Sequence, residues 1–437
     1  MVKNMKMTVI GAGYVGISTA LCFAHAGHET ILLECDSERF SKLKSGNCPF
    51  YEPIVQEWLS ELLESGMISV TDSPSQSIPF GDVIWIAVNT PARSDKLFDL
   101  SALESAISDI LKYRTDDVTV VIKSTVVTGT CRKLLQQIRQ IGTSIKINLV
   151  FSPEFLREGY AIQDLMSPSR VILGTEDGES SALIHKSYES LGIKSKLIVS
   201  TTFENAEVIK LASNSFLAIK LTYINELANY CQCVSADIDV VTYCMGLDER
   251  IAPGYMKSGI GYGGACLPKD TGALASHASQ NNMPLTILEQ TIFANETQIN
   301  NAANTISKHM PTGGVLAVLG ISFKPNSGDL RCSPALKILN FLITNHTYCI
   351  QLYEPYFNED IIERIQLPKS VRICANMNEA IDNADGMVIL TAHNQFRNIE
   401  LKSLKELMHG HILFDFFDCY SNESANEVGL KRITKID

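Results

Sequence analysis

Three glycines near the N-terminus constrain the fold of this chain more than any other feature. They form the pattern Gly11-Ala12-Gly13-Tyr14-Val15-Gly16, which follows the apolar run Met7–Ile10 and opens the helical pattern Gly16–Ala26. In a strand–loop–helix unit the first glycine allows a tight turn and the second lets the backbone approach a pyrophosphate. The third lets the helix pack closely on the strand. The pattern therefore predicts a Rossmann-type parallel sheet that binds a dinucleotide.

An acidic residue follows the second predicted strand, Thr30–Leu33. Glu34 lies 23 residues after Gly11, where an acid usually accepts hydrogen bonds from the adenosine ribose. A carboxylate there repels a 2′-phosphate and favours NAD over NADP, although the nearby Arg39 could accommodate that phosphate. We predict NAD as the cofactor, held by a set that includes Gly11, Gly13, Val15, Gly16, Glu34 and Arg39.

Short apolar runs alternate with helical patterns over the first two hundred residues. This alternation indicates βα units around a parallel sheet. The further strands are expected at Val83–Val88, Val118–Ile122, Ile145–Val150 and Val171–Gly174, and helices at Leu100–Leu111 and Cys131–Ile141.

The second half of the chain begins with a long helix and continues with another α/β alternation. No glycine or proline occurs from Ile193 to Met245, and apolar spacing predicts a helix from Glu204 to about Cys233. At 1.5 Å per residue it would be about 45 Å long, enough to join two lobes and to offer a face to a second subunit. The later strands are expected at Val315–Leu319, Cys349–Tyr353, Gly386–Leu390 and His411–Phe414.

This second alternation lacks a complete glycine motif, and Gly320-Ile321-Ser322-Phe323 is its nearest counterpart. We expect three regions: a Rossmann-like domain at 1–200, a central helical region at 201–311 and a second Rossmann-like α/β domain at 312–437.

Composition excludes several classes of protein. A chain of 437 residues exceeds what one core usually serves, and its net charge of −11 argues against a nucleic-acid partner. No apolar run reaches the roughly 18 residues that cross a bilayer, and Met1 leads directly into the first strand, so we expect a cytoplasmic protein. The twelve cysteines are scattered, and Cys231 and Cys233 have no second pair nearby, so we expect neither a disulfide framework nor a metal site.

One of these cysteines has a distinctive context. Cys266 lies in Gly263-Gly264-Ala265-Cys266-Leu267-Pro268-Lys269-Asp270, where the glycines permit close backbone approach and the last three residues resemble a helix start. Hydride transfer to a nicotinamide turns an alcohol into an aldehyde, which a thiolate can trap as a thiohemiacetal. A second hydride transfer gives a thioester, which water cleaves to a carboxylate. The pair of sites predicts a four-electron oxidation of an alcohol to an acid.

Two further clusters are candidates for the chemistry. Glu154 and Glu158, with Arg157 between them, follow the strand that ends at Val150, and strand ends are where such sheets place ligands. The alternative is a solvated turn with a surface ion pair. Lys210 and Asn214 share one face of the long helix and could donate to a developing alkoxide, or could form an exposed polar face.

These segments together resemble the UDP-glucose/GDP-mannose dehydrogenase family from about Met7 to Phe414. The resemblance implies two Rossmann-like domains, NAD-dependent oxidation of a nucleotide sugar, UDP-glucose to UDP-glucuronate, and a homodimer joined through the long helices. It rests on GAGYVG at 11–16, STV at 124–126, SPEFLREG at 152–159, KLASN at 210–214, GYGGACLPKD at 261–270 and FKPNSGDLR at 323–331.

The resemblance implies a role for each matching catalytic residue. Cys266 would be the nucleophile, its thiolate favoured by Lys269 or Lys210, and Glu158 would be the general base for thioester hydrolysis. The sugar C6 oxygen would be held by Lys210 and Asn214, and a water near it by Thr125 and Asp270. Either Lys210 or that water would take the first proton.

The same resemblance implies the binding contacts. Arg250 would reach the ligand of a neighbouring subunit, and the C-terminal domain would bind the UDP sugar. The cofactor site would add Thr90, Thr125, Glu158, Lys269 and Arg331. The substrate site would contain Glu154, Phe155, Leu156, Arg157, Glu158, Lys210, Asn214, Arg250, Tyr255 to Gly259, Gly263 and Lys324.

Simpler roles exist for some of these residues. Thr125 could be an ordinary strand-end residue and Asp270 a helix cap. Lys324 and Arg331 could merely balance the charge of Asp329.

Several positions depart from the family pattern. Glu34 stands where aspartate is more usual, and Cys332 where glutamate is usual. Asp415-Phe416-Phe417-Asp418 replaces the common Asp-Gly-Arg-Asn, and His393-Asn394-Gln395-Phe396 lacks a frequent tryptophan. The last two departures bear on which nucleotide is bound, not on the oxidation.

Other functions remain open on sequence alone. The same chemistry could act on GDP-mannose or a UDP-N-acetylhexosamine, although Ser152 and Phe155 favour an unacetylated UDP sugar. A single-step β-hydroxyacid dehydrogenase shares the glycine loop and the long helix but needs no cysteine. A catalytically silent sensor need not keep Cys266, Lys210 and Glu158.

Overall fold

The computed structural model describes residues 4–50, 52, 54–142, 144–179, 181–357, 365, 367–434 and 436. The chain divides into two compact units, Met1–Ser213 and Asn214–Asp437. Helix α9 (Phe203–Cys233) is a single helix of 31 residues that contains the boundary between them. The long helix predicted from the sequence is therefore confirmed.

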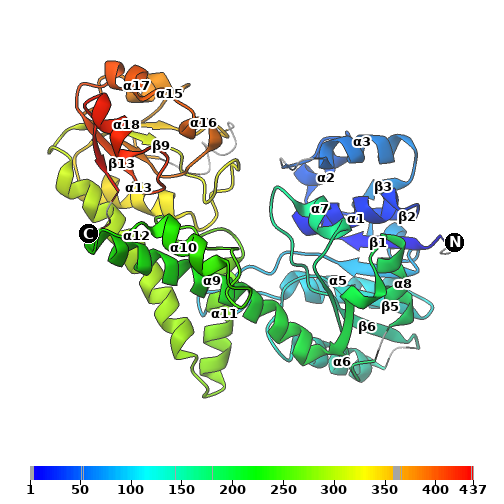
Figure 1. Cartoon of the computed structure of the whole chain (residues 1–437). Coiled ribbons are helices and arrows are strands. Elements are labelled where there is room, and N and C mark those ends of the chain that lie inside the picture. Colours follow the sequence, from blue (N-terminus) through cyan, green and yellow to red (C-terminus); the bar gives the residue numbers. More distant parts are fainter. Residues whose placement is uncertain are drawn as a thin grey trace. The chain divides into compact units, whose positions relative to one another are not determined.

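The first unit is built on an eight-stranded sheet in the order β3-β2-β1-β4-β5-β6-β7-β8 (Figure 1). The first six strands have the 3-2-1-4-5-6 order of a dinucleotide-binding fold. All neighbouring strands are parallel except β6 and β7, which pair antiparallel at Phe151 and Gly174. The strands are β1 (Lys6–Ile10), β2 (Glu29–Leu33), β3 (Ile68–Thr71), β4 (Val83–Ile86), β5 (Val118–Ile122), β6 (Ile147–Phe151), β7 (Val171–Thr175) and β8 (Ile198–Thr202).

The predicted strands of this sheet are all present, with ends that differ by two residues or fewer. Val88 lies beyond the end of β4 rather than inside it. The two strands that the sequence did not predict, β3 and β8, lie at the two edges of the sheet. Edge strands carry more polar residues and give a weaker apolar signal.

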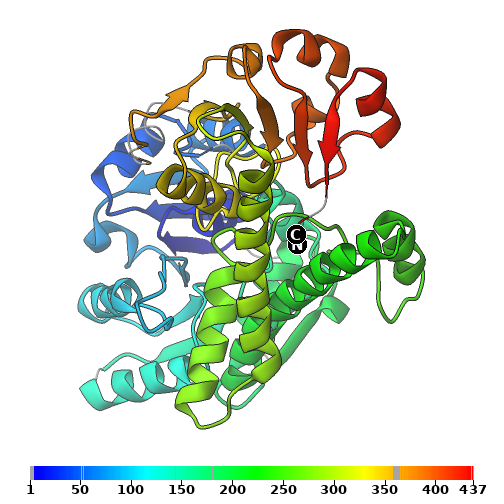
Figure 2. The same ribbon diagram turned by 90° about the vertical axis from the view of Figure 1, so that its left-hand side faces the viewer.

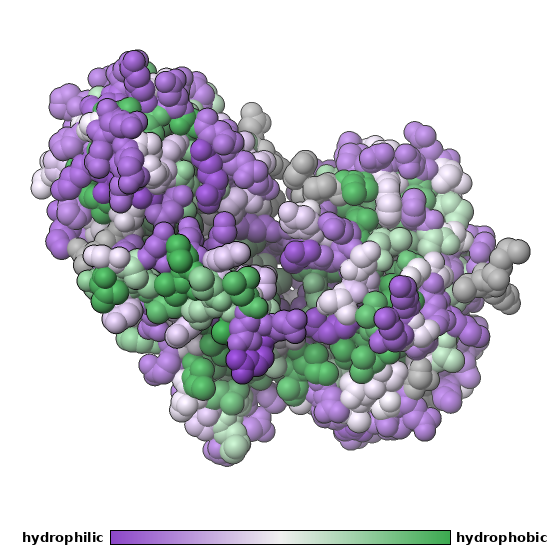
Figure 3. Space-filling view, viewed as in Figure 1, coloured by the Kyte–Doolittle hydropathy of each residue, from purple (hydrophilic) through white to green (hydrophobic). Residues whose placement is uncertain are grey.

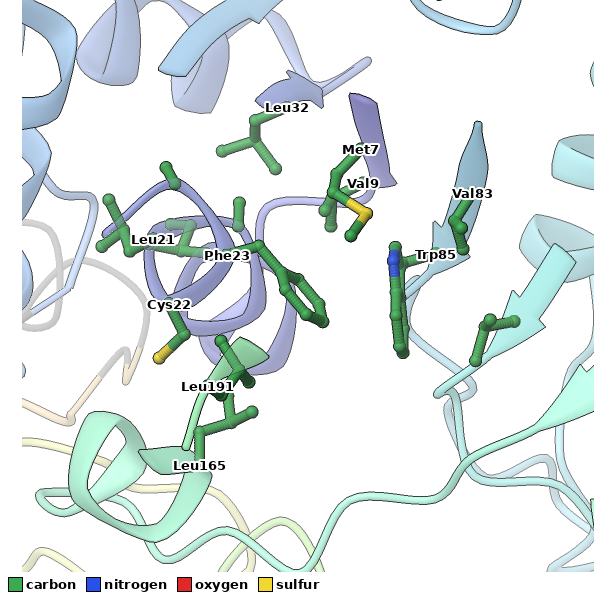
Figure 4. Close-up of a cluster of buried hydrophobic side chains, with 14 of the residues drawn as sticks. Met7, Val9, Leu21, Cys22, Phe23, Leu32, Val83, Trp85, Leu165 and Leu191 are labelled. Carbon is green, nitrogen blue, oxygen red and sulfur yellow. The ribbon is translucent and has the colours of Figure 1, made fainter. Parts of the chain in front are cut away.

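Helices connect these strands and cover the sheet. Helix α1 buries nearly its whole length because small and apolar residues follow the glycine loop. Figure 4 shows Phe23 of α1 facing Trp85 of β4, with ring centroids 4.8 Å apart. The helices are α1 (Tyr14–His25), α2 (Ser37–Lys44), α3 (Val55–Glu64), α4 (Pro74–Ser77), α5 (Ser101–Tyr113), α6 (Thr130–Ile141), α7 (Ala161–Met166) and α8 (Ala182–Ser190), with a short 3₁₀ turn η1 (Ser195–Leu197).

The second unit contains a six-stranded parallel sheet in the order β11-β10-β9-β12-β13-β14, which is again a 3-2-1-4-5-6 order. The predicted second Rossmann-like domain is therefore confirmed. Its strands are β9 (Val315–Leu319), β10 (Cys349–Tyr353), β11 (Val371–Ile373), β12 (Gly386–Ile389), β13 (Ile412–Asp415) and β14 (Lys431–Ile433). The helices after β9 are α13 (Pro334–Asn345), α15 (Met377–Ile381), α16 (Asn394–Arg397), α17 (Leu401–Leu407) and α18 (Asn422–Glu427).

Three helices precede this sheet: α10 (Ile238–Gly246), α11 (Leu267–Gln280) and α12 (Thr286–His309). Figure 2 shows α11 and α12 side by side. Hydrophobic side chains gather on the surface over α10 and the adjoining part of α9 (Figure 3). None of the helices in the described part of the chain is both long enough and apolar enough to cross a membrane.

Candidate active site

The glycine loop between β1 and α1 has the geometry of a dinucleotide cradle. Gly11 has φ +97°, and its N–H donates to the Leu33 carbonyl at 2.9 Å. A Cβ atom at Gly16 would lie 1.8 Å from the Gly11 carbonyl oxygen, so only glycine fits there. A Cβ atom at Gly13 would meet nothing closer than Asn89 Oδ1 at 3.8 Å, which leaves room for a pyrophosphate against the backbone. Val15 lies in the first turn of α1, where helix amides favour such an anion.

Glu34 ties this loop to the end of β2. Its carboxylate accepts hydrogen bonds from the Ala12 and Asp36 amides at 2.9 Å each, and it pairs with the Arg39 guanidinium at 3.1 Å. The predicted residues Glu34 and Arg39 therefore meet. Because Arg39 is already paired with a carboxylate, the pair suits a ribose hydroxyl better than a 2′-phosphate.

The loops after β4 and β5 are joined beside the cradle. Thr90 Oγ1 donates to the Thr125 carbonyl at 2.8 Å, and Ser124 Oγ donates to the Val88 carbonyl at 2.7 Å. These bonds bring together two residues that the resemblance assigns to the cofactor site.

Lys210 of α9 forms a buried ion pair with Glu154. Lys210 Nζ lies 2.8 Å from Glu154 Oε1 and donates to the Glu154 carbonyl at 2.7 Å, and the side chains are 2% and 9% exposed. Burial would raise the pKa of Glu154, but Lys210, the Leu156 amide and Lys123 outweigh it and lower that pKa. The exposed-face and surface-pair alternatives are therefore wrong for these two residues.

The remainder of the 152–159 segment is held by carboxylates that the sequence did not reveal. Arg157 pairs with Asp164 at 2.7 Å, and Glu52 accepts hydrogen bonds from the Gly159 and Ala161 amides at 2.7 and 2.8 Å. Sequence reasoning missed Glu52 because it lies 107 residues from Gly159.

A cavity of about 300 Å³ borders the same segment. Its walls include Glu154 and Arg157 but not Glu158. The Arg170 guanidinium lies 3.9 Å from the centre of the Phe155 ring. Of the two glutamates that the sequence places at this strand end, only Glu154 therefore borders the cavity, together with Arg157.

Cys266 is an exposed residue at the N-terminal cap of α11. Pro268 lies in the first turn of that helix, and the Asp270 amide donates to the Cys266 carbonyl at 2.9 Å, so the predicted helix start is confirmed. A Cβ atom at Gly263 would lie 2.4 Å from the Cys332 carbonyl oxygen. At Gly264, with φ +86°, it would lie 2.6 Å from the Phe323 ring. The predicted close approach of the cysteine loop to other backbone is therefore confirmed.

Asp270 contacts two other predicted residues in the second unit, Asn214 and Lys269. Its carboxylate accepts a hydrogen bond from Asn214 Nδ2 at 2.6 Å and pairs with Lys269 Nζ at 2.9 Å, while it is 1% exposed. Asp270 lies in the first turn of α11, but these side-chain partners give it more than a capping role.

The segment around Gly259 is fixed by amide side chains from α9 and α12. Asn225 Oδ1 accepts from the Gly259 amide at 2.8 Å, and Gln298 donates to the Gly259 carbonyl at 2.9 Å. Asn295 bonds both backbone groups of Tyr262 at 2.8 and 3.1 Å. The helical amides gave no signal in the sequence, because polar helix residues are usually solvent-exposed.

The remaining predicted contacts lie on exposed loops. Tyr255 has φ +60°, and Arg250 pairs with Asp248. Lys324 Nζ lies 5.3 Å from the centre of the Phe323 ring. Arg331 pairs with Asp329, as expected if Arg331 balances the charge of that carboxylate. Within the described residues, no three His, Cys, Asp or Glu side chains gather so as to hold a metal ion.

The turn after β9 in the second sheet resembles the glycine loop after β1, but its acidic residue, Glu354, is enclosed. The Gly320 amide donates to the Tyr353 carbonyl at 2.9 Å, as Gly11 does to Leu33, and Glu354 accepts from the Ile321 and Ser322 amides. Unlike Glu34, however, the Glu354 carboxylate is fully buried and lies 3.1 Å from His393 Nε2. A carboxylate enclosed in this way is not available to a ribose hydroxyl.

Three models of one protein family match successive parts of the chain. Residues 5–192 match the NAD binding domain of the UDP-glucose/GDP-mannose dehydrogenase family, 204–297 its central domain and 317–422 its UDP binding domain. The chain belongs to this family. It is an NAD-dependent oxidoreductase whose substrate is a nucleotide sugar.

Individual relatives cover nearly the whole chain. The UDP-glucose 6-dehydrogenase of Rhizobium meliloti is 34% identical over 433 residues, with 98% of each chain covered. The structure of a UDP-glucose dehydrogenase from Pyrobaculum islandicum is 26% identical, with a TM-score of 0.89 over 100% of this chain and 99% of that one. A UDP-D-ManNAc dehydrogenase from Pyrococcus horikoshii is 27% identical, with a TM-score of 0.84 over 96% of each chain.

Proposed function

We propose that this enzyme oxidises UDP-glucose to UDP-glucuronate in two NAD-dependent steps through a covalent intermediate on Cys266. The observation that carries the proposal is the exposed Cys266 at the start of α11, one turn before the buried network of Asp270 with Asn214 and Lys269. Relatives named UDP-glucose 6-dehydrogenase, which match the chain at about a third of positions, support this choice of sugar.

In the first oxidation, C6 of the glucose would lose a hydride, and NAD held by the glycine loop would supply the hydride acceptor. Lys210 and Asn214 hold the C6 oxygen, and Thr125 and Asp270 position a water beside it. Lys210 Nζ lies 2.8 Å from Glu154 Oε1, so the two side chains form an ion pair. Lys210 then acts as a donor to the developing oxyanion, and the water beside Asp270 takes the first proton.

In the second oxidation, the Cys266 thiolate attacks C6 of the aldehyde and forms a C–S bond. The N-terminus of α11 favours negative charge on the sulfur and on the hemiacetal oxygen. Loss of a second hydride from C6 gives the thioester. Glu158 then removes a proton from water, which attacks the thioester, and the C–S bond breaks to release the carboxylate and the thiolate.

The binding residues are proposed in the same way. The cofactor is held by Gly11, Gly13, Val15, Gly16, Glu34, Arg39, Thr90, Thr125, Glu158, Lys269 and Arg331. The nucleotide sugar is held by Glu154, Phe155, Leu156, Arg157, Glu158, Lys210, Asn214, Arg250, Tyr255, Gly259, Gly263 and Lys324. The three working regions are 1–200 for NAD, 201–311 for the cysteine and subunit contacts, and 312–437 for the UDP sugar.

A UDP-N-acetylhexosamine is the second candidate substrate, because a UDP-D-ManNAc dehydrogenase has a similar structure. Comparing kcat/KM for UDP-glucose, UDP-N-acetylglucosamine, UDP-N-acetylmannosamine and GDP-mannose decides between them. We expect UDP-glucose to exceed each of the others by at least about tenfold, or about 1.4 kcal/mol. A higher value for an N-acetylated sugar would contradict the choice of substrate while leaving the chemistry intact.

We propose a homodimer joined through α9. The support is a stripe of exposed aromatic residues seven positions apart, namely Phe216, Tyr223 and Tyr230, which are 62%, 53% and 62% exposed. In water such a stripe favours burial against another apolar surface. Light scattering should give twice the chain mass for the wild type and the monomer mass for Tyr223→Asp. A wild-type monomer would contradict the proposal.

We also propose that the enzyme works in the cytoplasm. The twelve cysteines form no disulfide in the described residues, which suits a reducing compartment.

A further inference from the structure

His393 is a fully buried histidine in the second unit that the proposed reaction does not use. It follows β12 and occupies the N-cap position of α16, in the stretch where this chain departs from the family pattern. The ring packs against Tyr356 and Phe396, with centroids 5.2 and 5.4 Å away. Its Cδ2 atom lies 3.1 Å from the place where a Cβ at Gly320 would be. The histidine therefore lies directly beside the glycine turn after β9.

The hydrogen bonds of His393 define one ring tautomer. The Asn326 amide donates to His393 Nδ1 at 2.9 Å. Because a backbone N–H can only donate, Nδ1 carries a lone pair, and the proton of the neutral ring lies on Nε2. Nε2 faces Glu354 Oε1 at 3.1 Å and Ser322 Oγ at 3.2 Å. These are the polar and charged groups that the structure places on the ring.

Glu354 also binds the backbone of the turn that follows β9. Its Oε2 atom accepts from the Ile321 amide at 2.8 Å and the Ser322 amide at 3.1 Å. His393 thus connects two segments at once, with Nε2 toward the Glu354-bound turn and Nδ1 toward Asn326. Asn326 itself has φ +57°, and its side chain accepts a second bond from the Asn394 amide at 3.3 Å.

Asn326 lies two residues after Lys324, the cation proposed to bind the nucleotide sugar. Within the described residues, the Asn326 amide bonds to His393 and its side chain accepts from Asn394, and both partners lie in the segment after β12. The chain between Phe323 and Asp329 is therefore anchored at its middle by Nδ1 of His393. Removal of that acceptor leaves the Asn326 amide without its partner.

We propose that His393 is a positioning residue that fixes the Lys324–Asn326 segment for binding of the nucleoside diphosphate. This role rests on the proposed function of Lys324. It predicts that the acceptor at the Nδ1 position, rather than the ring or the contact to Glu354, sets the affinity for the nucleotide.

Two substitutions separate these contributions. In His393→Asn the side-chain oxygen can occupy the place of Nδ1 and accept from Asn326, but it does not reach Glu354. In His393→Gln the amide can reach the place of Nε2 and donate to Glu354, but the Asn326 amide loses its acceptor. Both variants lose the ring packing, so we expect similar losses of melting temperature from both.

Hydrogen exchange and UDP binding then test the proposal. We expect residues 324–331 to exchange at least about tenfold faster in His393→Gln than in the wild type, and near the wild-type rate in His393→Asn. The Kd for UDP and the KM for UDP-glucose should rise at least about tenfold in His393→Gln and less than about threefold in His393→Asn, with kcat little changed in both.

Equal exchange rates in the two variants would overturn the anchoring role. Faster exchange in His393→Gln with unchanged affinity for UDP would overturn its link to nucleotide binding. Because the exchange measurement needs no substrate, it remains decisive even if the wild type does not oxidise UDP-glucose, a result that would contradict the proposed function instead.

Discussion

The second and third glycines of the nucleotide loop, Gly13 and Gly16, should respond differently to substitution by alanine. The change at Gly16 should lower stability, and the change at Gly13 should weaken NAD binding. A Cβ at Gly16 would lie 1.8 Å from the Gly11 carbonyl oxygen, whereas the nearest atom to a Cβ at Gly13 is Asn89 Oδ1 at 3.8 Å. Gly13 has φ −80° and ψ −174°, which alanine adopts without strain. Gly16→Ala must therefore distort the loop, and Gly13→Ala must not.

The magnitudes follow from these contacts. Overpacking against rigid backbone costs about 2–3 kcal/mol, which in a domain of this size lowers the melting temperature by about 4–12 °C. Gly13→Ala should shift the melting temperature by less than about 2 °C. It should nevertheless weaken NAD binding at least about tenfold, or about 1.4 kcal/mol, because the new methyl occupies the approach of the pyrophosphate.

Thermal unfolding and calorimetric titration with NAD measure the two effects separately. A Gly13→Ala protein that binds NAD like the wild type would contradict the approach of the pyrophosphate to Gly13. A Gly16→Ala protein with an unchanged melting temperature would refute the assignment of Gly16 to helix–loop packing.

Three further substitutions test other parts of the site. Glu34→Ala should weaken NAD binding at least about tenfold, because its hydrogen bonds to the loop are lost. It should also raise the ratio of kcat/KM for NADP to that for NAD, because the carboxylate that repels a 2′-phosphate is removed; an unchanged ratio would contradict its role. Cys266→Ser should abolish formation of the acid, as followed by product analysis, whereas the exposed control Cys332→Ser should retain it. Lys210→Met leaves Glu154 buried without its partner and should cost about 3–5 kcal/mol in urea unfolding at pH 7. Because the folded pKa of Glu154 lies below its ordinary value of 4.5, its stabilisation is present above that pH and is lost on acidification through the folded pKa. The cost of Lys210→Met should therefore shrink as the pH falls through the folded pKa of Glu154, and a cost that stays constant on acidification would contradict the ion pair.

Most of the fold followed from local sequence patterns. Buried parallel strands such as β5 and β9 are continuous apolar runs, and the glycine loop fixes which strand lies at the centre. The strands that escaped prediction are edge strands, and β11 and β14 have only three residues each. Such strands depend on pairing with a neighbour, which a local pattern does not contain.

The candidate site was only partly predictable for a related reason. Helical spacing placed Lys210 and Asn214 on one face, but their partners Glu154 and Asp270 are each 56 residues away in the chain. Glu52, which holds the backbone after Glu158, is still more distant from its partners. Contacts of this kind arise from the tertiary packing of separate elements, so the spacing of residues in the sequence does not predict them.

The central claim is that one active site carries out both oxidations of a UDP-glucose C6 alcohol through Cys266. The most direct test is to incubate the purified enzyme with excess NAD and limiting UDP-glucose and to count the NADH formed per sugar at completion. We expect about two NADH per UDP-glucose, with UDP-glucuronate as the product. A yield of about one would mean that the reaction stops at the aldehyde and would contradict the role of Cys266, and no NADH would contradict the choice of substrate.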